Sequence, residues 1–418
     1  MASFKRCPLL FLAALAGCVG AACSDGHDIS NPDAGAGSGG SSGTGGTGGQ
    51  SGSGGQTTDA AGGQSGGTGG QPSTMDAGPD AGGVAPETRA DLSSGDATDR
   101  DAPPSVPGDG SLGDANIKHI GRWDLSAANQ HVSYWGGAYL KVAFTGTTLQ
   151  MKVGSANNYY VSVDGGSWLK IANGNGTVNL TPARLPAGNH VAIVSGGKDY
   201  GYEFSFKGFV LDAGATTTAA SVRPTTIEFV GDSITAGYTD TMADVSDYAW
   251  LSAEKLGAEH TQIAYPGIAL VSNFGLNSDK TGIDKDYFRL KPLGYNPNPD
   301  WPASAYTPAL IVINIGTNDR ATNVPSATFQ MSYATFLASL RSRFPDAEIF
   351  AMRCFNGALA TETQMAVAAR MTAGDGKVHY VDTTGWLVAA DYTDGTHPSD
   401  AGHVKITGLL MPILGRYL

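Results

Sequence analysis

The sequence predicts an α/β protein in which an all-β domain precedes a parallel sheet. From Ile117 to about Ala213, short runs alternate apolar and polar residues between glycine-containing turns. Such alternation is typical of antiparallel hairpins in a sandwich or jelly roll. From Thr225 onward, apolar strand-like segments alternate with helical stretches. That order predicts a parallel sheet with helices on both faces.

The N-terminal residues have the pattern of an export signal. A basic start at Lys5 and Arg6 is followed by an apolar run and then by small residues, as in secretory signals. Within this segment, Leu15-Ala16-Gly17-Cys18 resembles the lipobox of bacterial lipoproteins. The resemblance implies a signal peptide of residues 1–17 and a lipid-modified Cys18. The alternative is an ordinary secretory signal cut at a later small residue such as Ala22.

Residues 18–115 consist mostly of Gly, Ser, Thr, Asp and Ala, with almost nothing apolar to bury. This composition predicts a disordered tether. The net charge of −12 comes without a basic patch, which argues against nucleic acid as a partner. Of the four cysteines, only Cys354 lies in the predicted folded part. No disulfide within a domain is therefore expected, and Cys354 is predicted to be a buried, unreactive thiol.

The predicted β domain covers residues 116–222 and needs no helix. Turns are indicated by Thr145-Gly146 and by Asp164-Gly165-Gly166, because glycine tolerates the backbone angles of tight turns. Strands are expected within residues 138–154, 158–168, 189–197 and 202–212.

The predicted α/β domain covers residues 223–418, with Arg223-Pro224 as the boundary. Its strands are expected within residues 226–231, 261–267, 309–316, 347–355 and 378–382. Polar residues that can cap a helix precede three helical stretches. They are Ser246 or Asp247 for a helix through Leu256, Ser326 for one through Arg343, and Ser399 for the terminal helix.

Polar loops follow the predicted parallel strands. They are Asp232-Ser233, Gly267, residues 316–319 (Gly-Thr-Asn-Asp) and residues 394–397 (Asp-Gly-Thr-His). Taken singly, each is an ordinary turn, bend, cap or surface histidine. In a doubly wound sheet, however, these loops meet at one edge. Together they supply a nucleophile, a base, an orienting carboxylate and donors for an oxyanion, which are the components of ester hydrolysis.

In order, these loops resemble the four blocks of the SGNH (GDSL-type) hydrolases, over about residues 226–418. With the β domain, and with "GRWDLS" followed by "YWGGAYLKVAFTGTTLQMKV", the chain resembles carbohydrate esterase family two. That family pairs a jelly roll with an SGNH domain and removes acetyl groups from polysaccharides. The resemblance implies a three-layer α/β/α, flavodoxin-like SGNH domain and an acetylesterase acting on acetylated polysaccharide or oligosaccharide, at the 6-position of hexosyl units.

The resemblance also implies roles for individual residues. Ser233 would be the nucleophile, His397 the base, and Asp394 the residue that orients the imidazole. The oxyanion hole would consist of the Ser233 and Gly267 backbone N–H groups and the Asn318 amide. Because some family members lack the aspartate, it stays open whether Asp394 is essential.

One position departs from the family pattern. A tryptophan is expected immediately before the catalytic histidine, but this chain has Thr396, so an aromatic sugar platform must come from elsewhere. The candidates for sugar contact are Tyr134, Trp135, Tyr238 and Trp386. The segment "SYWGG" is expected near the mouth of the cleft. On the acyl side, Tyr265, Pro266 and Ile268 are expected to leave little room beyond a methyl group.

The other conspicuous residues are interpreted as structural. Asp232 and Asp319 are expected to brace their loops through hydrogen bonds to backbone, and His403 to pack at the start of the terminal helix. No HxxH or HExxH motif occurs, which disfavours a zinc-dependent deacetylase. No metal or cofactor is expected.

Two other functions stay open. One is a glycan-binding surface lipoprotein with a silent hydrolase domain, although the predicted catalytic residues are all present. The other is an SGNH esterase acting on other short-chain acyl esters. A lipid-directed SGNH esterase is disfavoured, because the C-terminal domain has no long apolar insertion that would bind acyl chains. The protein is expected to be an exported monomer that contacts the membrane only through its lipid anchor, at the outer membrane or cell surface. Secretion is the alternative.

Overall fold

The computed structural model describes residues 106–197, 203–277, 280–292 and 294–418. The predicted signal peptide, the Cys18 lipidation site and nearly all of the predicted tether lie outside the described residues.

Two antiparallel sheets form the first half of the described chain, as the alternating pattern predicts. One has the order β1 (Lys118–Ile120), β4 (Tyr139–Gly146), β9 (Gly188–Gly196), β6 (Asn157–Val163) and β7 (Leu169–Gly174), with β11 (Thr217–Thr218) also paired to β4. The other has the order β2 (Trp123–Asp124), β3 (His131–Ser133), β10 (Phe204–Leu211), β5 (Leu149–Val153) and β8 (Thr177–Asn179). Alternate side chains such as Leu140, Val142, Met151 and Phe206 form a core shared by both sheets.

A five-stranded parallel sheet forms the second half. Its order is β13 (Glu259–Ala264), β12 (Thr226–Gly231), β14 (Leu310–Asn314), β15 (Glu348–Met352) and β16 (Val378–Val381). This is the flavodoxin-like order, in which the chain reverses direction across the sheet next to its first strand. The central strands β12, β14 and β15 are largely buried on both faces and mostly apolar, whereas β13 is buried but carries four polar residues, Glu259 to Gln262.

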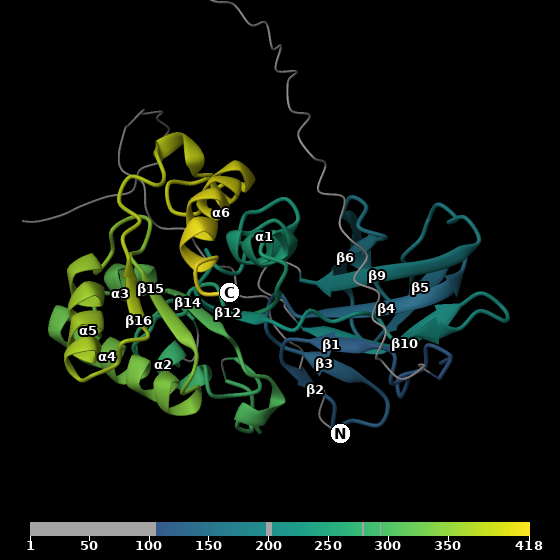
Figure 1. Cartoon of the computed structure of the whole chain (residues 1–418), viewed down its shortest axis with the longest axis horizontal. Coiled ribbons are helices and arrows are strands. Elements are labelled where there is room, and N and C mark those ends of the chain that lie inside the picture. The colour runs from purple at the N-terminus through teal and green to yellow at the C-terminus, as the bar shows by residue number, and fades with distance from the viewer. Residues whose placement is uncertain (1–105, 198–202, 278–279, 293) are drawn as a thin grey trace, which may run out of the picture. The chain divides into compact units, whose positions relative to one another are not determined.

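Helices cover both faces of the parallel sheet (Figure 1). On one face, Phe329 and Phe336 of α4 (Ser326–Arg343) pack with Ile311 and Ile313, and α5 (Ala360–Thr372) lies beside α4. On the other, α1 (Tyr248–Lys255) and α6 (Asp400–Leu414) pack together over Leu310 and Val312. The short elements are α2 (Ile283–Asp286), α3 (Thr317–Ala321), η1 (Ala243–Val245), η2 (Ala303–Ala305) and η3 (Ala389–Asp391).

Two of the expected helix caps are confirmed and one is wrong. Asp247 accepts a hydrogen bond from the Trp250 N–H at the start of α1, and Ser399 accepts one from the Gly402 N–H at the start of α6. Ser326, by contrast, is the first residue inside α4, and Pro325 occupies the capping position without a side-chain bond. Proline suits this position because its fixed φ leads into a helix.

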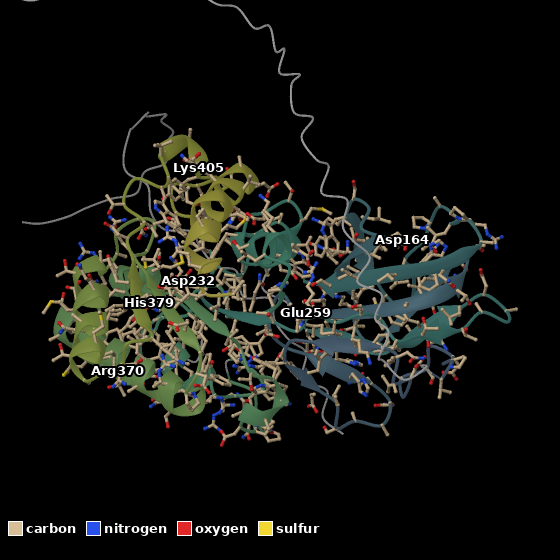
Figure 2. All side chains as sticks on the ribbon, viewed as in Figure 1. Asp164, Asp232, Glu259, Arg370, His379 and Lys405 are labelled. Carbon is tan, nitrogen blue, oxygen red and sulfur yellow. The ribbon has the colours of Figure 1, made fainter. Side chains whose placement is uncertain are left out.

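The two halves are joined by buried polar contacts within one compact unit. Arg122 of the β domain pairs with Glu228 of β12 at 3.5 Å, and both side chains are fully buried. Glu259 of β13 (Figure 2) accepts hydrogen bonds from Tyr139 and from Lys141, the latter at 2.6 Å. Because buried charges need partners, these contacts tie the β domain to the parallel sheet.

Cys354 is a free, buried thiol, and burial raises its pKa. Among the helices of the described residues, none combines the length and the apolar character needed to cross a membrane.

Candidate active site

The predicted catalytic residues all follow the carboxyl ends of parallel strands. Asp232 and Ser233 come directly after β12, Gly267 follows β13, and Asn318 lies in α3 after β14. His397 lies in the loop before α6. The parallel register of β12, β13 and β14 brings their ends to one edge, which is where open α/β sheets carry their sites.

Ser233, His397 and Asp394 form a hydrogen-bonded chain. His397 Nε2 lies 2.9 Å from Ser233 Oγ, and His397 Nδ1 lies 2.7 Å from Asp394 Oδ2. A proton on Nδ1 donates to the carboxylate and leaves Nε2 free to accept the serine proton. Such an arrangement activates a serine as a nucleophile.

Asp394 is held in place by backbone as well as by the imidazole. Its Oδ1 accepts hydrogen bonds from the N–H groups of Thr396 at 3.0 Å and His397 at 2.8 Å. Partial burial alone would raise the pKa of Asp394, but the bonds from the His397 backbone and ring outweigh it and lower the pKa. The carboxylate therefore stays ionised and can stabilise an imidazolium.

The residues expected to form the oxyanion hole follow the carboxyl ends of three adjacent strands, β12, β13 and β14. Gly267 has φ of +81°, a left-handed conformation that favours glycine, and its carbonyl accepts the Leu276 N–H at 2.8 Å. Within the described residues, neither the Ser233 nor the Gly267 N–H donates to another protein group. The Asn318 amide donates one hydrogen to the Ile268 carbonyl at 2.8 Å and keeps a second for a ligand.

The strand end before Ser233 has no room for a side chain. A Cβ on Gly231 would lie 2.1 Å from Thr235 Oγ1 and 2.7 Å from the Asn314 carbonyl oxygen. Asp232 (Figure 2) is fully buried and its Oδ1 accepts the Ile234 N–H at 3.1 Å, as expected for a residue that braces the loop. Burial, together with the nearby Asp319, raises the pKa of Asp232 to about 7.

Two of the four aromatic candidates lie away from Ser233. Trp135 is wrong as a sugar contact because it is 1% exposed, packs in the core and donates to the Leu290 carbonyl. Tyr134 packs against Tyr295 and under Lys291.

The hairpin that carries Tyr295 lies at the opposite end of the sheet. Its Trp301 carbonyl accepts a hydrogen bond from Arg343, the last residue of α4. Because α4 runs back from the active-site edge towards the start of β15, its end lies at the amino-terminal edge of the strands. The expectation that "SYWGG" lies near the cleft mouth is therefore wrong, since tertiary packing, which sequence does not reveal, places it against the α/β domain.

Tyr238 and Trp386 remain candidates for contact with a sugar. Tyr238 is half-buried, and its ring meets His397 edge to face at a centroid distance of 4.8 Å. Trp386 is half-buried in the loop after β16, beside Phe355. Of the two, Tyr238 directly borders a predicted catalytic side chain.

The residues next to Gly267 that were expected to limit the space for the acyl group are not placed as predicted. Ile268 is fully buried in the core, and Pro266 is buried. The prediction that these two side chains line the acyl pocket is therefore wrong. Leu276, which sequence reasoning missed, is 48% exposed and hydrogen-bonded to Gly267. No local signal marks Leu276, because the chain returns to Gly267 only in the folded loop.

The Tyr238 loop is anchored by residues that sequence reasoning also missed. Thr241 donates to Asp400 through its N–H at 3.1 Å and through its hydroxyl at 2.5 Å. Lys170, on β7 of the β domain, donates to the Thr241 carbonyl at 3.1 Å. The β domain thus supports a loop that touches His397.

His403 is structural, as expected. It is fully buried at the start of α6, and its Nδ1 accepts the Tyr248 N–H at 3.1 Å. Burial lowers the pKa of His403 to about 3. The part of the chain that the structure describes contains no group of three or more His, Cys, Asp or Glu residues arranged to hold a metal ion.

Two family profiles match separate parts of this architecture. Residues 229–405 match the GDSL-like Lipase/Acylhydrolase family, and residues 119–220 match the Carbohydrate esterase 2 N-terminal family. The chain joins a GDSL-type hydrolase domain to a carbohydrate esterase family two N-terminal domain. Both the fold class and the family resemblance predicted from sequence are therefore confirmed.

Individual relatives agree with this assignment. The chain is 28% identical over 313 residues to the cellulase/esterase CelE of Acetivibrio thermocellus, covering 69% of this chain and 38% of CelE. It is 28% identical over 285 residues to an acetylxylan esterase / glucomannan deacetylase of Cellvibrio japonicus, covering 60% of this chain and 78% of that protein.

Among solved structures, a family two carbohydrate esterase from Clostridium thermocellum in complex with cellohexaose is similar. It is 27% identical, with a TM-score of 0.62, over 72% of this chain and all (100%) of that one. The chain thus spans the whole of a solved esterase but only 38% of CelE.

Proposed function

We propose that this GDSL hydrolase is a serine esterase that removes O-acetyl groups from polysaccharides or oligosaccharides. The observation that carries the proposal is the chain Ser233–His397–Asp394, with distances of 2.9 and 2.7 Å, at the edge of a parallel sheet. Gly267 and Asn318 follow the ends of the strands on either side of β12 and have N–H groups left for a ligand.

The first half-reaction forms an acyl-enzyme. Ser233 Oγ attacks the ester carbonyl carbon while His397 Nε2 takes the hydroxyl proton. The carbonyl oxygen becomes an oxyanion and accepts hydrogen bonds from the backbone N–H groups of Ser233 and Gly267 and from the Asn318 amide. When the tetrahedral intermediate collapses, the bond to the sugar oxygen breaks and His397 returns its proton to that oxygen.

The second half-reaction hydrolyses the acyl-enzyme. A water molecule attacks the acyl carbon and gives a proton to His397. The bond to Ser233 Oγ then breaks, acetate leaves, and His397 reprotonates the serine. In both halves Asp394 accepts the Nδ1–H and stabilises the transient imidazolium.

The substrate class rests on the relatives and on the site. One relative is named for acetylxylan and glucomannan, and a similar structure holds cellohexaose. The family resemblance points to a primary hydroxyl, the 6-position of a hexosyl unit. Tyr238, edge-on to His397, is the aromatic best placed to contact a sugar in place of the tryptophan that Thr396 replaces.

The purified protein tests the proposal directly. Acetate release from acetylated xylan and acetylated glucomannan is measured beside hydrolysis of p-nitrophenyl acetate, butyrate and octanoate. We expect acetate release that disappears in Ser233→Ala, and the fastest turnover with the acetyl ester. Magnetic resonance of a multiply acetylated sugar should show the 6-acetyl group leaving first.

Different experimental outcomes would contradict different parts of the proposed function. Hydrolysis that survives Ser233→Ala would remove the serine mechanism. Faster turnover of octanoate would replace the acetylesterase by a lipid-directed esterase. Oligosaccharide binding without any ester hydrolysis would favour a glycan-binding protein with a silent hydrolase domain. Earlier loss of 2- or 3-acetyl groups would contradict the 6-position.

We also propose that Cys18, which lies outside the described residues, carries a lipid anchor. The support is the Leu15-Ala16-Gly17-Cys18 pattern, and two acyl chains hold a protein on a membrane where one is marginal. The full-length protein should fractionate with outer membranes, and Cys18→Ser should release it with unchanged specific activity. Recovery of the unmodified protein in the soluble fraction would count against the anchor.

A further inference from the structure

Two consecutive residues of α3 hold the loop that carries Gly267. Asn318 donates through its side-chain amide to the Ile268 carbonyl at 2.8 Å. Asp319 accepts the Leu270 N–H on Oδ2 at 2.8 Å and the Val271 N–H on Oδ1 at 3.0 Å. Three side-chain bonds thus join the loop after β13 to the helix after β14.

Asp319 itself is fully buried. Each carboxylate oxygen takes one N–H from the loop, so the carboxylate is bound by two adjacent peptide groups in a single orientation. A buried carboxylate satisfied in this way forms charge-assisted bonds, which are stronger than neutral ones. Nothing in the proposed reaction requires Asp319 to exchange a proton or to touch the substrate.

The position of this contact suggests its role. Gly267 and Asn318 are expected to donate to the same oxyanion, yet they come from two different loops. Stabilisation of an oxyanion depends on donors that are already aimed at the developing charge, and a displacement of about 1 Å can cost roughly 10²-fold in rate. The two bonds that Asp319 accepts and the Asn318–Ile268 bond are the side-chain contacts nearest to Gly267 in sequence that hold the loop against α3.

We infer that Asp319 is a positioning residue that fixes the Gly267 N–H relative to the Asn318 amide and so governs turnover rather than substrate binding. This inference rests on the proposed function, because it assigns Gly267 and Asn318 to the oxyanion hole. Asp319 acts through the loop at residues 270 and 271 and does not contact the reacting atoms.

The test is Asp319→Asn in the full chain, since asparagine has the same shape. Its amide nitrogen would face one of the two loop N–H groups and could not accept from it. We expect kcat for p-nitrophenyl acetate to fall by about 10- to 100-fold, less than the roughly 10² to 10³ for loss of a donor itself. KM should stay within about twofold.

A matched control separates positioning from general damage. Asp247 is also fully buried and accepts a backbone N–H, that of Trp250 at 2.9 Å, together with the Gln262 amide. Asp247→Asn makes the same substitution at an equally buried carboxyl outside the proposed site, so it should leave kcat nearly unchanged. An equal fall of kcat in both variants would make Asp319 merely structural.

A double variant gives the sharper criterion. If Asp319 works by aligning the hole, its effect should largely vanish once Asn318→Ala has removed one of the aligned donors. Independent, multiplicative losses in Asn318→Ala/Asp319→Asn would overturn the inference, as would a change in KM alone. If Asp319→Asn does not fold, Asp319→Glu, which keeps the charge but displaces it, should show the same loss of kcat with KM retained.

Failure of the proposed function can be recognised separately. If the wild-type protein hydrolyses no ester, the proposed function fails, and the rate at which a fluorophosphonate labels Ser233 replaces kcat. The phosphoryl oxygen of this probe also needs the oxyanion donors, so Asp319→Asn should slow labelling by about 10-fold or more relative to Asp247→Asn. Equal labelling rates would overturn the inference whatever the natural substrate.

Discussion

Replacing Arg122 by methionine should destabilise the whole hydrolase, although Arg122 belongs to the β domain. Its guanidinium pairs with Glu228 at 3.5 Å and donates to the carbonyls of Tyr287 and Arg289 and to the Tyr306 hydroxyl. Every one of these partners lies in the hydrolase domain. Methionine fills similar space but provides neither charge nor donors.

The size of the destabilisation follows from the loss of the ionic partner of Glu228. Glu228 is fully buried, and it would keep only the hydroxyl donors of Tyr287 and Tyr306. Removing one partner of a buried ion pair costs about 3–5 kcal/mol, because the other charge stays buried. With about 2–4 °C per kcal/mol for a large domain, Arg122→Met should lower the melting temperature by about 6–20 °C.

Urea unfolding and thermal melts measure the effect. The double variant Arg122→Met/Glu228→Gln should recover much of the loss, since no unpaired charge remains. The control is Arg289→Met, which breaks the surface pair with Asp300, whose two side chains are 44% and 79% exposed. Exposed pairs contribute about 1 kcal/mol or less.

Two results would refute this reasoning. One is a loss below about 1 kcal/mol in Arg122→Met, which would mean that water reaches Glu228 or that the pair is dispensable. The other is a double variant no more stable than the single one. A separate melting transition for the β domain would also show that the buried contacts do not couple the two halves.

Three further predictions follow from the site and its surroundings. Ser233→Ala and His397→Ala should each reduce kcat to near background with an unchanged melting temperature, and their losses should not multiply in the double variant; turnover that survives either change contradicts the mechanism. Gly231→Ala should destabilise by about 1–3 kcal/mol or more in urea unfolding, because its Cβ would meet Thr235 and the Asn314 carbonyl, whereas Gly113→Ala, where nothing lies within 4 Å, should be nearly neutral. Asp240 faces His403 at 3.4 Å with Asp400 nearby, and burial raises its pKa to about 8, so the native state holds a proton that the unfolded state has lost above about pH 4. Stability should therefore fall as pH rises from about 5 to 8, and Asp240→Asn should be increasingly stabilising over that range; a stability difference independent of pH would exclude this titration.

Both fold classes and the loops that carry the catalytic residues could be predicted from the amino-acid pattern. The doubly buried strand β14 is apolar from Leu310 to Ile313, whereas sandwich strands such as β4 alternate, and both patterns are local. Polar residues that interrupt an apolar strand at its end, such as Ser233 after β12, mark the edge where parallel strands finish. Because the carboxyl ends of such strands meet at one edge, Ser233, Asn318 and His397 could be grouped before any coordinates were known.

The side chains that surround the site, by contrast, depend on how distant segments pack together. Trp135 and Ile268 were predicted to contact the substrate, but both are buried in the core. The contacts of Leu276 with Gly267 and of Asp319 with Leu270 arise because the chain after β13 folds back on itself and on α3. The physical reason is that an aromatic or apolar residue has the same local pattern whether it faces a sugar or a core, and a carboxylate near a turn bonds to whichever peptide groups the fold brings to it.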